Sequence, residues 1–191
     1  MNYKNYIQEN DLIVKIGSYD GLAYENYGFR EMVINQKHEC HLIEPQPSVF
    51  ERLKVNYKDS VNEINFYNLA IYDSNGECDF HICSTNPVES SFVRHTNFDT
   101  IKVKTQTIDS FLEENNIFEI GGLFLDIEGT EDIVISQLFE KTNILPKLIR
   151  YEYPHLANND ALEKYIKSKG YIVGNCIYSP DDKVCVRSDV F

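Results

Sequence analysis

Residues 12–21 read Leu-Ile-Val-Lys-Ile-Gly-Ser-Tyr-Asp-Gly, and the rest of the chain is organised around this stretch. Four of its first five residues are apolar, which predicts a short buried strand, and Gly17 then opens a turn that Gly21 closes. Because glycine has no Cβ, such a turn lets a nucleotide-like ligand approach backbone N–H groups. An ordinary strand-to-helix turn explains the same residues equally well, so the residues downstream must decide between the two interpretations.

Helix and strand patterns alternate after this turn. A helical pattern covers residues 22–36, with Gly28 interrupting it, and a short strand occupies residues 40–43. The sequence Pro-Gln-Pro-Ser at residues 45–48 ends that strand and precedes a second helix. This alternation indicates a parallel sheet with crossover helices, in which ligands bind beyond the carboxyl ends of the strands.

Glu44 ends the second predicted strand, a little more than about 20 residues after the glycine turn. An acid at this position can accept hydrogen bonds from both ribose hydroxyls of an adenosine. The alternative is a solvated carboxylate at the end of a strand. Taken together with the turn, Glu44 favours a nucleoside site.

The middle of the chain predicts a third strand and a β-ribbon. The third strand covers residues 64–69. A turn at residues 73–76 then leads into a strand at residues 77–83, so we expect an antiparallel ribbon around this turn. Residues 100–107 alternate as a further strand. Residues 84–99 between them are polar and predict an ordered loop or lid beside a site.

The last part of the chain continues the alternation and ends in a hairpin. Asp109 and Ser110 are expected to cap a helix. A strand at residues 147–153 and a helix at residues 157–169 come next. Strands at residues 171–178 and 183–186 then predict an antiparallel hairpin.

Residues 121–131, Gly-Gly-Leu-Phe-Leu-Asp-Ile-Glu-Gly-Thr-Glu, place three acids after a buried strand. Carboxylates that lie close together raise one another's pKa, which suits a general base, or they share a divalent cation. The candidates are Asp126, Glu128 and Glu131. The alternative for Glu131 is that it begins the next helix and matches the charge of the helix N-terminus.

His155 ends the stretch Tyr-Glu-Tyr-Pro-His after the strand at residues 147–153. Histidine accepts a proton near neutral pH, so His155 is a third catalytic candidate beside Asp126 and Glu128, although a lone histidine is often structural.

Composition limits the class of protein. With 191 residues and 42% hydrophobic content, the chain is expected to form a single domain over residues 1–191, with residues 1–11 as a lead-in segment. The formal net charge of −12 argues against nucleic acid as a partner.

The sequence lacks an apolar run long enough to cross a membrane, and it lacks the pattern of a signal peptide. We therefore expect a cytoplasmic protein without membrane contact. The five cysteines include no Cys-x-x-Cys pair and predict neither disulfides nor a zinc site.

Several blocks taken in order resemble the FkbM-like family of S-adenosylmethionine-dependent methyltransferases. The blocks Thr-Ile-Asp-Ser-Phe-Leu and Leu-Asp-Ile-Glu-Gly-Thr-Glu are the most specific, and the resemblance runs from about residue 12 to the C-terminal hairpin. The blocks that carry it are residues 16–21, 41–47, 66–76, 103–112 and 125–131.

The resemblance implies an α/β fold, a Rossmann-like class I methyltransferase sandwich with a mostly parallel seven-stranded sheet and an antiparallel C-terminal hairpin. It implies O-methylation of a hydroxyl on a sugar, glycan or secondary metabolite, with S-adenosylmethionine as cofactor. The glycine turn would hold the methionine end, Glu44 the ribose, and the turn after the third strand the adenine, with Asp126 near the methyl group. The implied cofactor-binding residues are Gly17, Ser18, Tyr19, Asp20, Gly21, Glu44, Asn68, Ala70 and Asp126.

Two positions depart from the family pattern. Lys15 stands where members commonly have an acid that helps to hold the cofactor's ammonium group, and Phe124 replaces a usual lysine. Asp20, Asp126 or Glu128 would then have to hold the ammonium group. These departures keep open a second class, a binding protein that retains the fold without catalysis. A third, an NAD-type oxidoreductase, is disfavoured because the turn lacks the Gly-x-Gly-x-x-Gly spacing.

The sequence leaves the acceptor open beyond a small molecule or glycan. It also leaves open the oligomeric state and whether Asp126, Glu128 and Glu131 hold a divalent cation.

Overall fold

Five mostly apolar strands lie parallel in the main sheet. The computed structural model describes residues 1–22, 28–83, 90–92 and 98–190, so part of the predicted helix 22–36 and most of the predicted lid 84–99 lie outside the described residues. The five strands are β1 (Leu12–Ile16), β2 (Glu39–Ile43), β3 (Ile64–Tyr67), β7 (Gly122–Leu125) and β8 (Leu148–Glu152).

The C-terminal hairpin completes this sheet. Its strands are β9 (Tyr171–Asn175) and β10 (Asp182–Arg187), and the order in the sheet is β3-β2-β1-β7-β8-β10-β9. β10 runs antiparallel to both β8 and β9. The predicted mostly parallel seven-stranded sheet with an antiparallel C-terminal hairpin is therefore confirmed.

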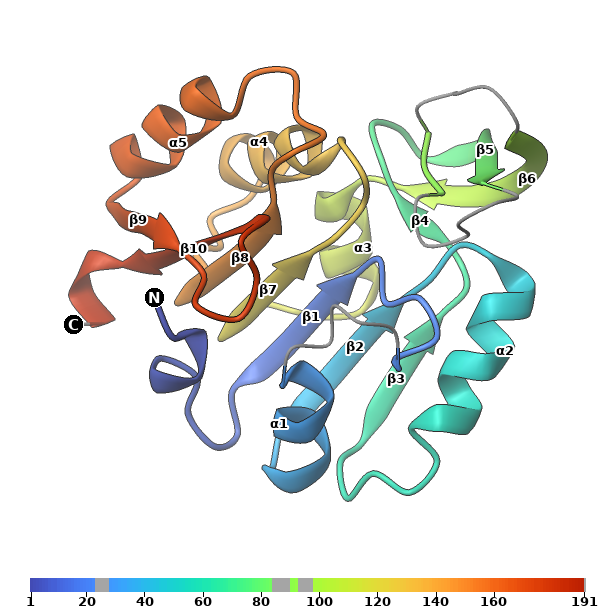
Figure 1. Cartoon of the computed structure of the whole chain (residues 1–191), viewed down its shortest axis with the longest axis horizontal. Helices are drawn as coiled ribbons and strands as arrows, with labels where there is room; N and C mark the ends of the chain where they lie inside the picture. The colour runs from blue at the N-terminus through green and yellow to red at the C-terminus, as the bar shows by residue number, and fades with distance from the viewer. Residues whose placement is uncertain (23–27, 84–89, 93–97, 191) are drawn as a thin grey trace.

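Helices cover both faces of the sheet (Figure 1). One layer consists of α3 (Ile108–Glu114), α4 (Glu131–Lys141) and α5 (Asn159–Ser168), and the other of α1 (Phe29–Asn35), α2 (Pro47–Asn56) and the short 3-10 helix Tyr3–Asn5. Alternate residues of β1 enter the two cores: Val14 and Ile16 pack with the first layer, and Ile13 packs with the second. Among the described residues, no helix has the length and apolar character needed to cross a membrane.

A second, smaller sheet comes after β3 and lies near the carboxyl ends of β2 and β3 (Figure 1). It contains β4 (Ala70–Ile71), β5 (Gly76–Cys83) and β6 (Phe98–Gln106), in the order β4-β6-β5. β5 pairs antiparallel with β6 along its whole length. The predicted ribbon around the turn at residues 73–76 is therefore wrong, because β3 pairs with β2 and β4 pairs with β6, and neither pairs with β5 within the described residues.

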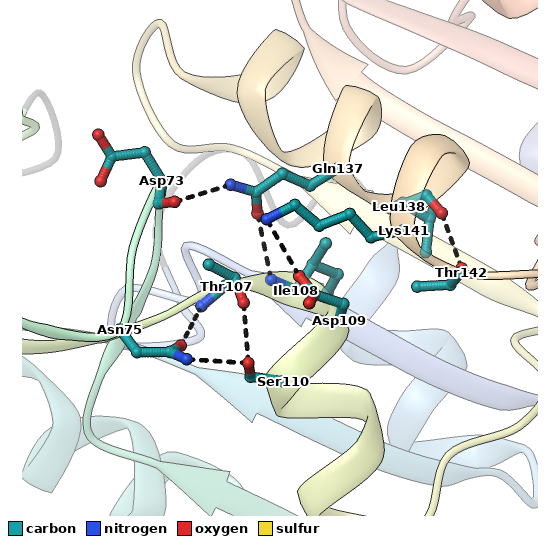
Figure 2. A network of polar contacts seen from close by, with 10 residues as sticks. All are labelled: Asp73, Asn75, Thr107, Ile108, Asp109, Ser110, Gln137, Leu138, Lys141 and Thr142. Atoms are coloured by element: carbon teal, nitrogen blue, oxygen red, sulfur yellow. Dashed lines mark hydrogen bonds and ion pairs between the residues drawn. The ribbon is translucent and has the colours of Figure 1, made fainter.

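Polar side chains connect the small sheet to the helices beside the main one (Figure 2). Gln137 of α4 donates to the carbonyl oxygen of Asp73 at 3.1 Å, and its amide oxygen accepts from the backbone N–H of Ile108. The side-chain oxygen of Asn75 accepts from the backbone N–H of Thr107 at 2.8 Å. The turn between β4 and β5 is therefore held against the start of α3 and the middle of α4.

The predicted starts of two helices need correction. Thr107 stands at the N-cap position of α3 without a side-chain cap hydrogen bond, and Asp109 lies inside the first turn with its carboxylate 3.6 Å from Lys141, so the predicted cap at Asp109 and Ser110 is wrong. α5 begins at Asn159 and not at residue 157 as predicted. Asn158 is its N-cap residue, and the side-chain oxygen of Asn158 accepts from the backbone N–H of Ala161 at 3.0 Å.

α1 begins at Phe29, directly after Gly28 with its left-handed φ of +81°, which is where the helical pattern of the sequence is interrupted. Residues 23–27 of the predicted helix lie outside the described residues.

All five cysteines are free, and four of them are buried, in agreement with the prediction that disulfides are absent.

Candidate functional site

The turn after β1 approaches the end of β7 so closely that only glycine fits at its first position. Gly17 has a φ of +77°, and a Cβ there would lie 1.8 Å from the carbonyl oxygen of Asp126. The backbone N–H groups of Gly17 and Ser18 both donate to the carbonyl oxygen of Ile43, at 3.2 and 3.0 Å. The turn is therefore fixed between the ends of β2 and β7.

Glu44 lies under this turn and is only 3% exposed. One carboxylate oxygen accepts from the N–H of Tyr19 at 2.8 Å, and the other accepts from the N–H of Gln46 at 2.9 Å. Burial raises the pKa of Glu44 to about 7, although the two N–H donors act in the opposite direction. The alternative of a solvated strand-end carboxylate is therefore wrong.

A cleft opens at the carboxyl ends of β1, β2, β7 and β8, with about 710 Å³ of unfilled space when its open mouth is included. Gly17, Tyr19 and Glu44 form one part of its lining. Apolar residues 69–71 form another, and the small sheet contributes Phe80. The lining of apolar and aromatic side chains with a few polar groups is typical of a small-molecule site.

An aromatic cluster forms the wall of the cleft on the side of the small sheet. Phe80 and Phe92 both line the cleft, and their rings meet edge to face with centroids 5.2 Å apart. Tyr72 stacks on Phe92 at 3.8 Å between centroids. The sequence patterns did not predict this wall, because pairing across the small sheet and not spacing along the chain brings the rings together.

Five of the predicted cofactor-binding residues line the cleft: Gly17, Tyr19, Glu44, Ala70 and Asp126. The other four build the loops around it. Their roles toward a cofactor stay predictions.

The remaining four predicted residues contact the loop backbone or neighbouring side chains. The Ser18 hydroxyl donates to the carbonyl oxygen of Lys15, and the Asp20 carboxylate accepts from the N–H of Leu22. A Cβ on Gly21 would lie 2.3 Å from the Tyr57 ring. The Asn68 amide donates to the carbonyl oxygens of residues 44 and 45, which fixes the loop after β2.

Glu131 turns away from the cleft and is fully buried. Its two oxygens accept from the N–H groups of Ile127 at 2.8 Å and Gly129 at 3.0 Å, and burial raises its pKa to about 7. It is also the first residue of α4. The prediction that Asp126, Glu128 and Glu131 share a cation is therefore wrong for Glu131, because its carboxylate holds the loop before α4.

Glu128 and His155, which lie on different loops, come together. Glu128 has a left-handed φ of +59°, and its Oε2 lies 3.2 Å from Nε2 of His155. The side chain of Glu128 is 13% exposed and that of His155 is 52% exposed. Glu128 lines the cleft together with Asp126, whereas His155 contacts Glu128 but is not among the described residues of the lining.

Glu152 is a cleft residue that the sequence patterns did not single out. Glu152 is the last residue of β8, just as Asp126 directly follows β7. Its position at the end of the neighbouring parallel strand is the signal that could have identified it. Burial raises its pKa to about 10, and the nearby carboxylates of Asp126 and Glu128 add to the effect.

Lys15 points to the opposite face of the sheet from the α3-α4-α5 core. It is 6% exposed, pairs in register with Phe124, and lies with its Nζ 5.1 Å from the centre of the Phe29 ring. With Asp126, Arg150 and three other residues it lines a separate small cavity. Lys15 is not among the described residues that line the main cleft.

Comparisons with known proteins agree with this fold. The family model for the methyltransferase FkbM domain matches residues 15–173. A Clostridium thermocellum protein assigned as an rRNA methylase is similar in structure, with a TM-score of 0.55 and 10% identity over 96% of this chain and 89% of that one. Fibrillarin from Aeropyrum pernix, solved with bound S-adenosyl-L-methionine, has a TM-score of 0.49 and 12% identity over 94% of this chain and 67% of that one.

A search among proteins of curated function found no match. The likeness to the Clostridium thermocellum protein shows the fold, and the family match spans most of the chain, from the middle of β1 to β9. The chain therefore belongs to the FkbM family of S-adenosylmethionine-dependent methyltransferases.

Proposed function

We propose that this chain transfers the methyl group of S-adenosylmethionine to a hydroxyl oxygen of a small molecule or glycan. One observation supports the proposal most: Gly17, Glu44 and Asp126 line the same cleft. A loop that fits a nucleoside and acids that suit a reacting hydroxyl thus share one cavity.

The residues present fit the cofactor. The approach of Gly17 to the backbone leaves no room for a side chain, so the backbone of the turn faces the cleft directly. Each oxygen of Glu44 accepts one N–H and retains a further lone pair for a ribose hydroxyl. Ala70 and its apolar neighbours offer a surface for the base. Bound S-adenosylmethionine supplies an electrophilic methyl group on a sulfonium.

Removal of the acceptor proton is assigned to the acids of the cleft. Asp126 and Glu128 line the cleft and can accept a proton from a hydroxyl held there. The Nε2 of His155 faces Glu128, so His155 stabilises that carboxylate and does not itself contact the acceptor. Holding the acceptor oxygen at near-attack distance from the methyl group can lower the activation free energy of such a reaction by on the order of 7 kcal/mol.

The place of Lys15, the net charge and the family match bear on the alternatives kept open and on the class of acceptor. Lys15 does not belong to the described lining of the cleft but shares a small neighbouring cavity with Asp126, so it lies beside the cleft and not in it. The formal net charge of −12 disfavours a nucleic-acid acceptor. The family match disfavours an oxidoreductase.

Calorimetric titration with S-adenosylmethionine, followed by transfer of a radiolabelled methyl group to a panel of polyols, sugars and phenols, tests the proposal. We expect binding in the micromolar range and a base-stable methyl ether as product. Glu44→Gln should lose affinity, whereas Glu51→Gln, which removes an exposed acid of α2, should not. Absence of binding to folded protein at about 1 mM cofactor would contradict the proposal.

A further inference from the structure

Three metal-ligating atoms converge at the end of the cleft formed by β7 and β8. One carboxylate oxygen each of Glu128 and Glu152 and one ring nitrogen of His155 lie within 4.8 Å of one another. Glu128 comes from the loop after β7, whereas Glu152 ends β8 and His155 lies just beyond it. The parallel sheet therefore assembles the group from two separate segments, and it includes a histidine nitrogen as well as carboxylates.

A buried oxygen of Glu152 points independently to a ligand. Its Oε2 is inaccessible to solvent and has no hydrogen-bond partner among the described residues. Buried polar atoms in folded proteins nearly always have a partner. Glu152 also lines the cleft, so a bound cation could supply the missing contact.

The charge of the cleft agrees with a cation at this place. Asp126, Glu128 and Glu152 all contribute carboxylates to the lining, and the described lining contains no lysine, arginine or histidine. The nearby guanidinium of Arg150 is paired with Asp182. The nearest basic side chains thus lie outside the described lining: His155 contacts Glu128 at 3.2 Å, and Lys15 shares a small neighbouring cavity with Asp126.

We propose that Glu128, Glu152 and His155 bind one divalent cation of the first transition row, and that this site prefers Mn²⁺ to Mg²⁺ or Ca²⁺. Mg²⁺ and Ca²⁺ favour sites made only of oxygen atoms, whereas an imidazole nitrogen beside two carboxylates suits a transition metal. The 3.2 Å between Glu128 Oε2 and His155 Nε2 fits two adjacent ligands of one ion, since ligands at about 2.1 Å and a right angle lie about 3 Å apart.

This proposal does not rest on methyl transfer, because the ion is expected to bind the protein without cofactor. When it is bound, Glu128 is a ligand, and Asp126 is the carboxylate of the cleft that stays available to accept a proton. The cation site and the cofactor site are then tested by separate titrations.

Metal-free protein is titrated with Mn²⁺, and the loss of the paramagnetic resonance signal of free aqueous Mn²⁺ measures binding. We expect one ion per chain, with a Kd below about 100 µM, and at least tenfold weaker binding of Mg²⁺ in competition. His155→Gln and Glu152→Gln should each weaken Mn²⁺ binding about tenfold or more. Asp132→Asn, which removes an exposed acid in the first turn of α4, is the matched control and should bind as wild type.

The proposal is overturned if wild-type protein binds no Mn²⁺ at about 1 mM, if Mg²⁺ binds more tightly than Mn²⁺, or if both ligand variants bind Mn²⁺ normally. Should Glu152→Gln fail to fold, His155→Gln decides alone, because the side chain of His155 is half exposed and its loss leaves no buried cavity.

Discussion

We expect Gly17→Ala to lower the free energy of unfolding by about 3–4 kcal/mol and to abolish binding of S-adenosylmethionine. A left-handed φ of +77° costs an alanine about 1–2 kcal/mol. The new Cβ would also lie 1.8 Å from the carbonyl oxygen of Asp126, a distance that the backbone must increase by more than about 1 Å. This movement strains the hydrogen bonds from Gly17 to Ile43 and from Asp126 to Ile16, each of which contributes about 1 kcal/mol.

Gly170→Ala is the matched control for the backbone cost alone. Gly170 has a similar φ of +88°, and the nearest atom to its Cβ would be Ser188 Oγ at 3.9 Å, an ordinary contact. We expect this variant to lose only about 1–2 kcal/mol and to bind the cofactor normally. Equilibrium unfolding in urea and calorimetric titration measure both effects. Equal stability of the two variants, with normal cofactor affinity for Gly17→Ala, would refute the close approach of the turn to β7.

Three further predictions concern buried charges. Burial raises the pKa of Glu44 to about 7, and ribose hydroxyls donate to its charged form. The affinity of the wild-type protein for the cofactor, measured by calorimetry, should therefore rise between about pH 6 and about pH 8, whereas that of Glu44→Gln should not change over this range. In Glu131→Gln, an amide N–H₂ group would face one of the two backbone N–H donors, those of Ile127 and Gly129. The free energy of unfolding measured in urea should therefore fall by about 1–3 kcal/mol, and an unchanged midpoint would contradict these contacts. Arg150→Met leaves the buried carboxylate of Asp182 without its guanidinium partner, so the free energy of unfolding should fall by about 3–5 kcal/mol. Adding Asp182→Leu to this variant should restore most of the lost thermal midpoint; no recovery would contradict the described pair.

Protonation of the buried acids also determines how stability depends on pH. In the folded protein the pKa values of Glu44 and Glu131 are raised from 4.5 to about 7, so the folded state binds more protons than the unfolded state between these values. The stability that these groups contribute is present in full below about pH 4.5 and is lost as the pH rises through about 7. Bound cofactor should offset the part that comes from Glu44.

The arrangement of the main sheet was predictable because its strands are apolar on both faces and alternate with helices. The apolar runs at residues 12–16 and 123–125 indicated buried strands, and the turn residues Gly17 and Gly21 identified where the first one ends. The place of Glu44 beside that turn was predictable from its position at the end of β2, whereas its burial was not. The predictable features depend on local sequence and on the general rules of parallel sheets.

The direction of individual side chains could not be predicted in the same way. Asp126, Glu128 and Glu131 are neighbours in sequence, but the carboxylate of Glu131 is buried and accepts two N–H groups of its own loop. The third acid that lines the cleft is instead Glu152, at the end of the neighbouring strand β8. Lys15 occupies the face of β1 opposite to Val14, which strand alternation implies, but only the register with Phe124 shows what lies beside it. Packing between distant segments decides such cases.

A crystal structure with S-adenosylhomocysteine, the product of methyl transfer, tests the central claim most directly. We predict a nucleoside beyond the carboxyl ends of β1 and β2, with both ribose hydroxyls donating to the carboxylate of Glu44 and the sulfur near Asp126. Density for the nucleoside outside the cleft, or ribose hydroxyls that do not contact Glu44, would contradict it.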